Sequence, residues 1–441
     1  MYIPHLTVNK WGYYISNPIM GNAFNITKKG LCNKMDNPLS KIIIRVKKFY
    51  RKTRKFLKKI VIKLYKIETK ILPVNKNIII FESNLGRNYT GNPRCIYEEM
   101  VKLGLDKKYR CYIILDDITT KVPGNAIKLK RTRVKYFFIM GIAGVWVCDS
   151  RQPNYIIKRK NVHYIQTWHG TPLKKLALDM ESVNMGGETD IDKYKKNFYD
   201  NTRTWDYLIS QNHFSTNVFR RAFAFDKEML EIGYPRNDIL FWGNNKEYIN
   251  SLKQTMGLPL DKKVLLYAPT WRDNEYYKKG AYKFTNALDF DELKSKLGDE
   301  YVIIIKYHYL VKENIDWSNY KDFVFKFDTC DDIAQLYLLS DMLITDYSSV
   351  MFDYSILKRP MLFFTYDLED YKDNLRGFYF DFIEEAPGPI TKTTGELIAS
   401  IKNYKEEEYK EKYDAFHNKF NHADDGMASK KVVDLILKLT K

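Results

Sequence analysis

The sequence predicts an α/β protein with two doubly wound parallel-sheet domains that face a cleft, preceded by a basic amphipathic helix. The chain has 441 residues, of which 45% are apolar and 29% charged, which fits two globular domains and an appendage. From Asn77 onward, short continuous runs of Val, Ile, Leu and Phe alternate with helix-like stretches. This pattern is typical of βαβ units whose strands are buried on both faces.

The positive charge of the chain is concentrated in one segment. The formal net charge is +18, and residues 40–70 contain thirteen Lys or Arg and one acid, so this segment carries +12. Its apolar residues recur every three or four positions, which predicts an amphipathic helix with a cationic face. Residues 1–38 contain no motif that indicates a role.

Three roles are open to this helix. It can lie on an anionic membrane, form a linker packed on its own protein, or bind nucleic acid. The membrane role is favoured, because no recognised nucleic-acid-binding module accompanies the basic run. We therefore expect no nucleic-acid partner. The residues expected at the membrane surface are Lys47, Lys48, Arg51, Lys52, Arg54, Lys55, Lys58 and Lys59.

Targeting and redox patterns favour a protein of the reducing cytoplasm. The longest apolar run, Phe137–Val147, is shorter than the roughly 20 residues of a membrane-spanning helix, and the N-terminus has no signal-peptide pattern. The five cysteines are scattered, and Cys111 and Cys148 fall in strand-like runs, which predicts buried hydrophobes. No acidic metal cluster is evident. We expect no required cofactor, although a divalent cation stays open.

The strand-like runs fall into two series. The first series is Ile78–Phe81, Cys111–Leu115, Gly144–Cys148, Val162–Thr167, Tyr207–Ser210 and Met229–Ile232. The second series is Val264–Ala268, Tyr301–Lys306, Phe323–Phe327, Met342–Thr345 and Met361–Phe364. A Gly- and Pro-containing stretch, Phe241–Pro259, is the expected junction. The predicted domains are therefore 1–75, 76–245 and 246–441, and the last helix could cross back to the first sheet.

Chemically useful side chains follow several of the predicted strands. Ligands of open α/β sheets bind beyond the carboxyl ends of the strands. His169 follows the fourth strand, with Gly170 and a Thr-Pro pair after it, and an imidazole there can accept a proton near neutral pH. A structural histidine that caps a turn is the competing interpretation.

The second series adds hydroxyls and cations at strand ends. Pro269, Thr270 and Arg272 follow its first strand, and Lys306, Tyr307 and His308 follow its second. Ser348 and Ser349 stand at a predicted helix start, where free N–H groups and the helix dipole favour an anion, although they could be simple N-caps. Together these residues suit a donor that contains a pyrophosphate. GxGxxG, GxxxxGK[ST] and GxSxG motifs do not occur.

These motifs resemble those of the CDP-glycerol glycerophosphotransferases, the teichoic-acid primases and polymerases. The resemblance covers about Ile78 to Lys441 in the family's order. It rests chiefly on four motifs: Trp168–Pro172, Gly233–Asp238, Tyr267–Arg272 and Ser340–Tyr354. One departure is Tyr309 after His308, where many relatives carry Pro.

The resemblance implies a GT-B-like fold of two Rossmann-like domains, the first on the acceptor side and the second on the donor side. It implies transfer of a polyol phosphate from a CDP-linked donor, with release of CMP. The donor contacts it implies are Trp168, His169, Gly170, Thr171, Pro172, Arg236, Pro269, Thr270, Lys306, Tyr307, His308, Asp346, Ser348, Ser349 and Asp353.

The resulting hypothesis is a glycerophosphotransferase at the cytoplasmic face of the membrane, acting from CDP-glycerol on a lipid-linked saccharide or a growing polymer. His169 is the expected general base, and His308, Lys306 and Arg236 are expected to stabilise charge on the pyrophosphate. The two imidazoles could exchange roles. Alternatives are a CDP-ribitol donor, a nucleotide-sugar glycosyltransferase, and a non-catalytic scaffold of wall or capsule assembly.

Overall fold

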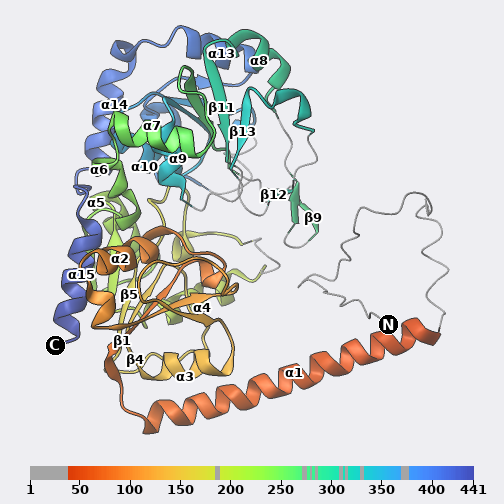
Figure 1. The fold of residues 1–441 in the computed structure, drawn as a ribbon, viewed down its shortest axis with the longest axis vertical. Helices are drawn as coiled ribbons and strands as arrows, with labels where there is room; N and C mark the ends of the chain where they lie inside the picture. The colour runs from red at the N-terminus through yellow and green to blue at the C-terminus, as the bar shows by residue number, and fades with distance from the viewer. Residues whose placement is uncertain are drawn as a thin grey trace. The chain divides into compact units, whose positions relative to one another are not determined.

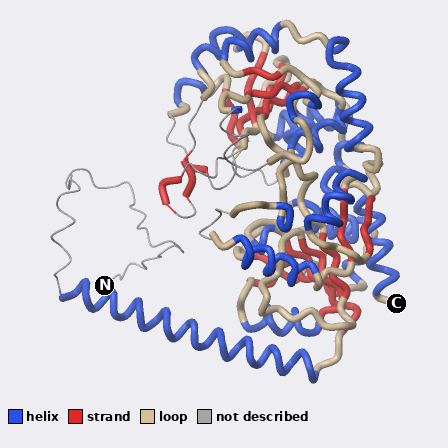
Figure 2. Tube along the Cα trace, turned by 180° about the vertical axis from the view of Figure 1, so that it is seen from behind, coloured by secondary structure: helices blue, strands red, loops and turns tan. Residues whose placement is uncertain are grey.

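The computed structural model describes residues 38–183, 189–270, 276–278, 281–283, 287–306, 311–312, 316–327, 332–368 and 377–441. The chain divides into two compact units, Met1–Val61 and Ile62–Lys441. The second unit contains two parallel sheets with helices around each of them (Figure 2). This confirms the predicted fold class of two doubly wound α/β domains.

The first sheet has seven parallel strands in the order β3-β2-β1-β4-β5-β6-β7. The strands are β1 (Asn75–Glu82), β2 (Arg110–Leu115), β3 (Ile127–Lys130), β4 (Ala143–Cys148), β5 (His163–Gln166), β6 (Tyr207–Ser210) and β7 (Glu228–Glu231). The helices in this part of the chain are α2 (Gly91–Lys102), α3 (Val134–Ile142), α4 (Ile191–Thr202) and α5 (His213–Ala222). The short helices α6 (Ile239–Trp242) and α7 (Lys246–Thr255) then lead to the second sheet.

The second sheet has six parallel strands in the order β13-β11-β8-β14-β15-β16. The strands are β8 (Lys263–Tyr267), β11 (Tyr301–Ile305), β13 (Val324–Lys326), β14 (Met342–Thr345), β15 (Met361–Phe364) and β16 (Ile390–Thr391). The helices are α8 (Phe290–Leu297), α9 (Ile333–Leu339), α10 (Val350–Tyr354), α12 (Phe382–Glu385), α13 (Thr394–Lys402), α14 (Glu406–Phe420) and α15 (Ala428–Leu439). A small separate sheet contains β9 (Tyr276–Lys278), β10 (Ala281–Lys283) and β12 (Val311–Lys312).

The strand orders of the two sheets place a switch point in each of them. The chain moves outward from β1 through β2 to β3, and then returns to the other side of β1 to form β4. The second sheet repeats this path, with β8 in the place of β1 and β14 in the place of β4. Ligands of doubly wound sheets bind beyond the strand ends at such switch points. Ligands are therefore expected near the loops after β1 and β4 in the first sheet, and near the loops after β8 and β14 in the second.

Both faces of the central strands are covered by apolar side chains. Leu266 and Leu265 are neighbours in β8, and each is fully buried in a different core cluster of the second sheet. The alternation follows from the strand's two-residue period, which points successive side chains to opposite faces. Continuous apolar runs are therefore the correct sequence pattern for these strands.

The C-terminal helix packs on the first sheet, although it follows the second sheet in the chain. Val432, Val433 and Ile436 of α15 are fully buried in the core cluster that contains β1, β2 and β4. The preceding helix α14 lies beside the second sheet (Figure 1). Its Phe416 and Phe420 pack in a core cluster of that sheet. The α14–α15 segment thus connects the two domains a second time.

The basic segment forms the helix α1 (Pro38–Ile71). In the unit that ends at Val61, the described side chains of Val46, Phe49 and Phe56 are exposed. The side chains of Lys47, Arg51, Arg54 and Lys55 lie outside the described part of the chain. Near the end of α1, Tyr65 is buried and its hydroxyl exchanges hydrogen bonds with the backbone of Ile157. No helix in the described ranges is both long enough and apolar enough to cross a bilayer.

All eleven predicted strands occur, ten of them within one residue of their expected bounds, whereas β1 begins three residues before the expected Ile78. Cys111 and Cys148 are buried as expected. The sequence missed β3 and β16 of the two large sheets, and also β9, β10 and β12 of the small sheet. The β3 sequence, Ile-Lys-Leu-Lys, lies at a sheet edge and has only one buried residue. The β16 strand has two residues, which is too short for a periodicity.

Truncating Ile436 to Ala should destabilise the protein by about 2–5 kcal/mol, because it leaves a cavity where α15 meets the first sheet. The same truncation at the exposed Lys438, two residues along the helix, is the matched control. Urea unfolding followed by fluorescence measures both. Equal unfolding midpoints for the two variants would show that α15 does not contribute to this core.

Candidate active site

Residues that follow strands of both sheets line one cleft with a volume of about 280 Å³. Trp168, His169, Gly170, Thr171 and Pro172 come from the loop after β5 in the first sheet. The second sheet contributes Pro269 and Thr270 after β8, and Ser348 and Ser349 after β14. The loops after β8 and β14 are the two loops at the switch point of the second sheet. Nine of the residues singled out from the sequence thus share one cavity.

The loop that carries His169 is held in an unusual backbone conformation. Trp168 has φ +50°, a left-handed conformation that costs a non-glycine residue energy. Its indole is buried against the aromatic rings of Phe198, Trp205, Phe219 and Phe223. This packing stabilises the strained residue, and the next ring, His169, stacks on Trp168 with centroids 4.5 Å apart.

Asn92 connects this loop to a second segment of the cleft. Its side-chain Nδ2 donates to the carbonyl oxygens of Thr167 and Trp168, at 3.2 and 3.1 Å. Its Oδ1 accepts a hydrogen bond from the backbone N–H of Arg236 at 3.1 Å. Asn92 is buried at the beginning of α2, so its position is fixed by the core beneath the site.

The hydrogen bonding of His169 selects one tautomer. Its Nδ1 lies 3.2 Å from the backbone carbonyl oxygen of Asp149. A carbonyl oxygen can only accept, so Nδ1 must carry the proton, and Nε2 of the neutral ring then has a free lone pair. The contact with Asp149 therefore prepares Nε2 to accept a proton.

The surroundings also keep His169 neutral. Desolvation in the protein, together with the nearby positive charge of Arg236, lowers the pKa of His169 to about 4, although the hydrogen bond to Asp149 opposes this shift. The ring can still be reached by solvent from the cleft. At neutral pH this histidine is consequently unprotonated, as a general base must be.

Arg236 and Asp353 form a buried ion pair beside His169. The Nη2 of Arg236 donates to Oδ2 of Asp353 at 2.5 Å, and Asn237 donates to the other carboxylate oxygen at 2.8 Å. The Nη1 of Arg236 donates to the backbone carbonyl of His169 at 2.8 Å. Both side chains were predicted to contact the donor. The structure pairs them with each other, between the turn after β7 and the helix α10.

Gly170 brings the first loop into contact with the serine pair. Its φ is +155°, and a Cβ atom at this position would lie 3.4 Å from the hydroxyl oxygen of Ser349. Ser349 directly precedes α10, as the sequence predicts, but its side chain makes no capping hydrogen bond. The α10 helix has only five residues, so its dipole is weaker than the sequence analysis expected.

Thr171 and two further predicted residues, Asp346 and Lys306, have polar groups engaged within the protein. The Thr171 hydroxyl donates to Gln211 and accepts from Asn212 and Ser215. Asp346 accepts a hydrogen bond from the backbone N–H of Thr270 at 2.8 Å, which joins the loops after β14 and β8. Lys306 donates to the carbonyl of Phe327 at 3.0 Å. These contacts hold the loops of the cleft in place.

The other three predicted residues, Arg272, Tyr307 and His308, lie outside the described residues. The pairing of two imidazoles therefore stays a prediction. Within the described ranges, no group of three or more His, Cys, Asp or Glu side chains is placed to hold a metal ion.

Asp149 is a site residue that the sequence analysis missed. It directly follows β4 at the switch point of the first sheet, as Asp346 follows β14 in the second. Its Oδ1 accepts hydrogen bonds from the N–H of Asn84 and the hydroxyl of Ser150. Burial raises the pKa of Asp149 to about 7. The equivalent position of Asp346 was the signal that could have identified it.

Replacing Asp353 with Asn should destabilise the protein by about 3–5 kcal/mol, because it leaves the Arg236 guanidinium without its buried counter-ion. The same change at Asp414, which forms an exposed pair with Lys410, should leave stability almost unchanged, because solvent screens the pair. Thermal unfolding of both variants tests this. A small effect at Asp353 would mean that the pair does not hold the two domain edges together.

Comparison with known proteins identifies relatives along most of the chain. The sequence model of the CDP-glycerol:poly(glycerophosphate) glycerophosphotransferase family matches residues 64–438. The teichoic acid poly(glycerol phosphate) polymerase of Bacillus subtilis (strain 168) is 48% identical over 371 residues, which are 83% of this chain and 49% of that protein. The protein of the same name from Bacillus spizizenii is 47% identical over 83% of this chain and 93% of its own length.

This chain therefore spans about half the length of the B. subtilis relative and nearly all of the B. spizizenii one. Among solved structures, the wall teichoic acid polymerase TagF superimposes with a TM-score of 0.81 and 43% identity, over 90% of this chain and 98% of the TagF chain. The family match, over residues 64–438, includes both sheets and the described residues of the cleft. The chain belongs to the CDP-glycerol:poly(glycerophosphate) glycerophosphotransferase family.

Proposed function

We propose that this protein transfers glycerol phosphate from CDP-glycerol to a lipid-linked acceptor or a growing teichoic-acid-type polymer and releases CMP. The observation that carries the proposal is a neutral His169, with Nε2 available, in a cleft formed by loops of both sheets. A TagF variant, 43% identical to this chain, has been soaked with CDPG, which supports a CDP-linked donor.

The sequence identities to named relatives favour glycerol over ribitol as the polyol of the donor. Those named for glycerol phosphate polymerisation are 47–48% identical to this chain, whereas a teichoic acid poly(ribitol-phosphate) polymerase is 32% identical. A relative named teichoic acid glycerol-phosphate transferase, from Staphylococcus aureus, is 42% identical over 82% of this chain. The acceptor and the number of units added belong to the proposal as well.

In the proposed reaction, Nε2 of His169 removes the proton from an acceptor hydroxyl. The acceptor oxygen forms a bond to the β-phosphorus of CDP-glycerol, while the bond from that phosphorus to the bridging oxygen breaks. The electron pair of the broken bond leaves with CMP. Ser348, Ser349 and Thr270 line the same cleft as His169, and in this proposal they position phosphoryl oxygens. Phosphoryl transfer depends mainly on such positioning and charge stabilisation.

A donor panel tests the proposal. The purified protein is mixed with an acceptor that ends in glycerol phosphate and with CDP-glycerol, CDP-ribitol or UDP-glucose, and nucleotide release is measured. We expect CMP release from CDP-glycerol, and we expect EDTA to leave the rate unchanged because no cofactor is proposed. Faster nucleotide release from CDP-ribitol or UDP-glucose would show that CDP-glycerol is not the preferred donor. No release from any donor would favour the scaffold alternative.

Replacing His169 with Ala should lower kcat about 10²–10⁴-fold, because it removes the general base. CDP-glycerol binding, measured by calorimetry, should persist. His213, which is exposed at the beginning of α5, is the matched control for the same substitution and should retain the wild-type rate.

The pH profile separates a base from a structural role for His169. Because the pKa of His169 is lowered to about 4, the ring stays neutral down to that pH. The kcat/KM of the wild type should therefore hold at pH 5.5, where a histidine of ordinary pKa is mostly protonated, and fall only at lower pH. An acidic limb centred near pH 6.5 would contradict this assignment.

We also propose that α1 binds the anionic cytoplasmic face of the membrane. Its described basic side chains Lys48, Lys52, Lys58 and Lys59 are exposed, as are apolar residues such as Phe49 and Phe56. Changing these four lysines to Gln should weaken binding to phosphatidylglycerol vesicles by about 1 kcal/mol for each charge. Cosedimentation of protein with vesicles measures the loss.

The control for the membrane experiment is a second set of four exposed lysines changed to Gln: Lys402, Lys405, Lys410 and Lys412. This set changes the net charge equally but lies outside α1. Equal loss in both variants would indicate a general charge effect rather than a membrane-binding helix. Deletion of residues 1–61 provides an independent check, since it removes the four lysines and leaves the Tyr65 contact intact.

A further inference from the structure

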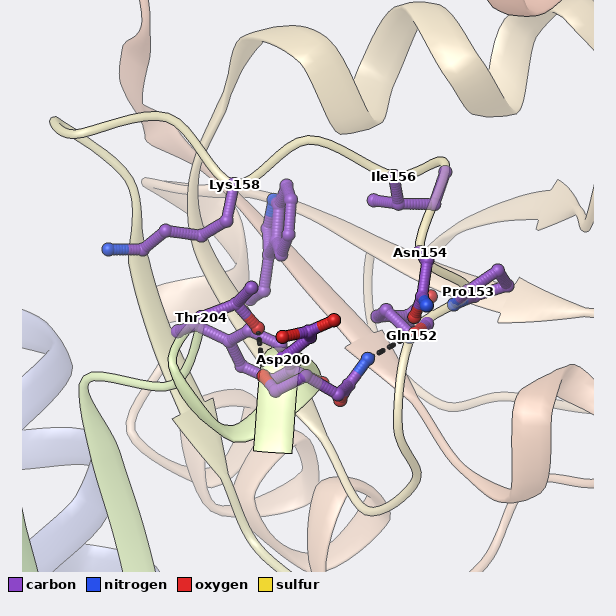
Figure 3. A pocket seen from close by; sticks show the side chains of 10 residues that line it. Gln152, Pro153, Asn154, Ile156, Lys158, Asp200 and Thr204 are labelled. Carbon is purple, nitrogen blue, oxygen red and sulfur yellow. Dashed lines mark hydrogen bonds between the residues drawn. The ribbon is translucent and has the colours of Figure 1, made fainter. Parts of the chain in front are cut away.

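The first domain contains a second cavity, separate in its lining residues from the cleft around His169. Its volume is about 240 Å³, several times the roughly 30 Å³ that one water molecule occupies. It lies above Trp146 of β4 and Tyr164 of β5, which are paired in the sheet, and it is closed by the loop 152–158 and the end of α4. Figure 3 shows Asn154 and Ile156 across from Thr204, with Asp200 between them.

Two buried polar atoms of the lining residues have no hydrogen-bond partner among the described residues: Trp146 Nε1 and Asn201 Oδ1. The amide of Asn201 is oriented, because its Nδ2 donates to the carbonyl of Gln152 at 2.6 Å. One donor and one acceptor are thus left unsatisfied, and each such buried group costs about 1–3 kcal/mol. Both atoms are almost fully covered by the surrounding residues, so a ligand hydroxyl reaches them only when the lining side chains shift slightly. A hydroxyl group can then satisfy both kinds of atom, because it donates and accepts.

The charges around the cavity decide against a phosphate. Asp200 contributes a carboxylate to the lining, and its Oδ2 accepts a hydrogen bond from the exposed Lys196 at 2.9 Å. The other charged lining residue is Lys158, whose ammonium group is paired with Asp206 at 2.6 Å, and Figure 3 shows it directed away from the cavity. Both ammonium groups are thus already paired with carboxylates, so an anion would gain little attraction from either of them. A neutral molecule with several hydroxyls can donate to the other oxygen of Asp200.

The loop that closes this cavity also holds His169. Gln152 lines the cavity, and Asp149, three residues earlier, supplies the carbonyl that fixes the His169 tautomer. Three residues span at most about 10 Å, so the cavity lies close to the cleft. The Tyr164 hydroxyl donates to the carbonyl of Ser150 within the same loop.

We propose that this cavity binds a neutral polyhydroxylated unit, either a sugar ring or a glycerol. It would be an accessory subsite for an acceptor that extends beyond the cleft. The acceptor assignment rests on the proposed function, whereas the binding of a neutral polyol does not. A polymeric acceptor offers several units at once, so a second contact near the cleft would help to hold it while its end reacts.

Binding is tested on the intact protein without CDP-glycerol, by saturation-transfer NMR titrations with glucose, glycerol and inorganic phosphate. We expect saturable binding of glucose or glycerol and none of phosphate, and the comparison of the two neutral probes distinguishes a sugar site from a glycerol site. Asp200→Asn and Trp146→Phe should each weaken binding about fivefold to tenfold, the effect of one lost hydrogen bond.

Asp192→Asn is the matched control, since Asp192 is exposed on the same helix but does not line the cavity. It should leave the affinity unchanged. Circular dichroism checks that the Trp146 variant folds. Asp200 is exposed, so its substitution should not disturb folding, and the Asp200 variant tests the proposal even if the Trp146 variant does not fold. Absence of saturable binding, a preference for phosphate, or equal weakening in the control would overturn the proposal and assign the cavity to water only.

The acceptor role has its own readout. Asp200→Asn should raise the acceptor KM severalfold in the CMP-release assay and leave kcat near that of the wild type. An unchanged KM would overturn the acceptor role. If no donor supports CMP release but polyol binding still depends on Asp200 and Trp146, the proposed function fails and the binding site stands.

Discussion

The buried pair between Arg236 and Asp353 is the interaction on which the cleft depends. It joins the turn after the last strand of the first sheet to the helix after β14 of the second. The same guanidinium also donates to the backbone of His169, so one side chain positions both walls of the site. A buried charge pair is stabilising only when further hydrogen bonds complete it. Asn237 supplies such a bond to Asp353.

The buried side chain and the strained backbone of Trp168 together fix the position of the neighbouring His169. The aromatic rings around Trp168 stabilise a backbone conformation that would otherwise be unfavourable, and this conformation turns His169 toward the cleft. Desolvation and Arg236 keep the imidazole neutral, while the carbonyl of Asp149 sets its tautomer. The imidazole is thereby held neutral, and no carboxylate among the described residues pairs with it. The energetic cost of the left-handed backbone at Trp168 is offset by the packing of its indole against aromatic rings of the same domain.

One loop of the first domain connects three features of the molecule. Asp149 at its beginning contacts His169, Gln152 and Asn154 line the second cavity, and Ile157 is bound by Tyr65 near the end of α1. A change at the end of α1 or in the cavity therefore has a short path to the histidine, along the loop and through the hydrogen bond between Asp149 and His169.

The sequence by itself determined the fold class, the central strands and which strand ends carry polar side chains. Strands buried on both faces must be continuous apolar runs, so β8 and β14 can be recognised locally, whereas the Lys-containing edge strand β3 cannot. Only the tertiary structure decided what those polar residues contact. Arg236 and Asp353 are 117 residues apart in the chain, and local patterns carry no information about such a pairing. The position of Asp149 at a strand end can be recognised by analogy with Asp346, but its contact with His169 cannot. That contact comes from a backbone carbonyl, a group that every residue has and that only the fold can place beside an imidazole.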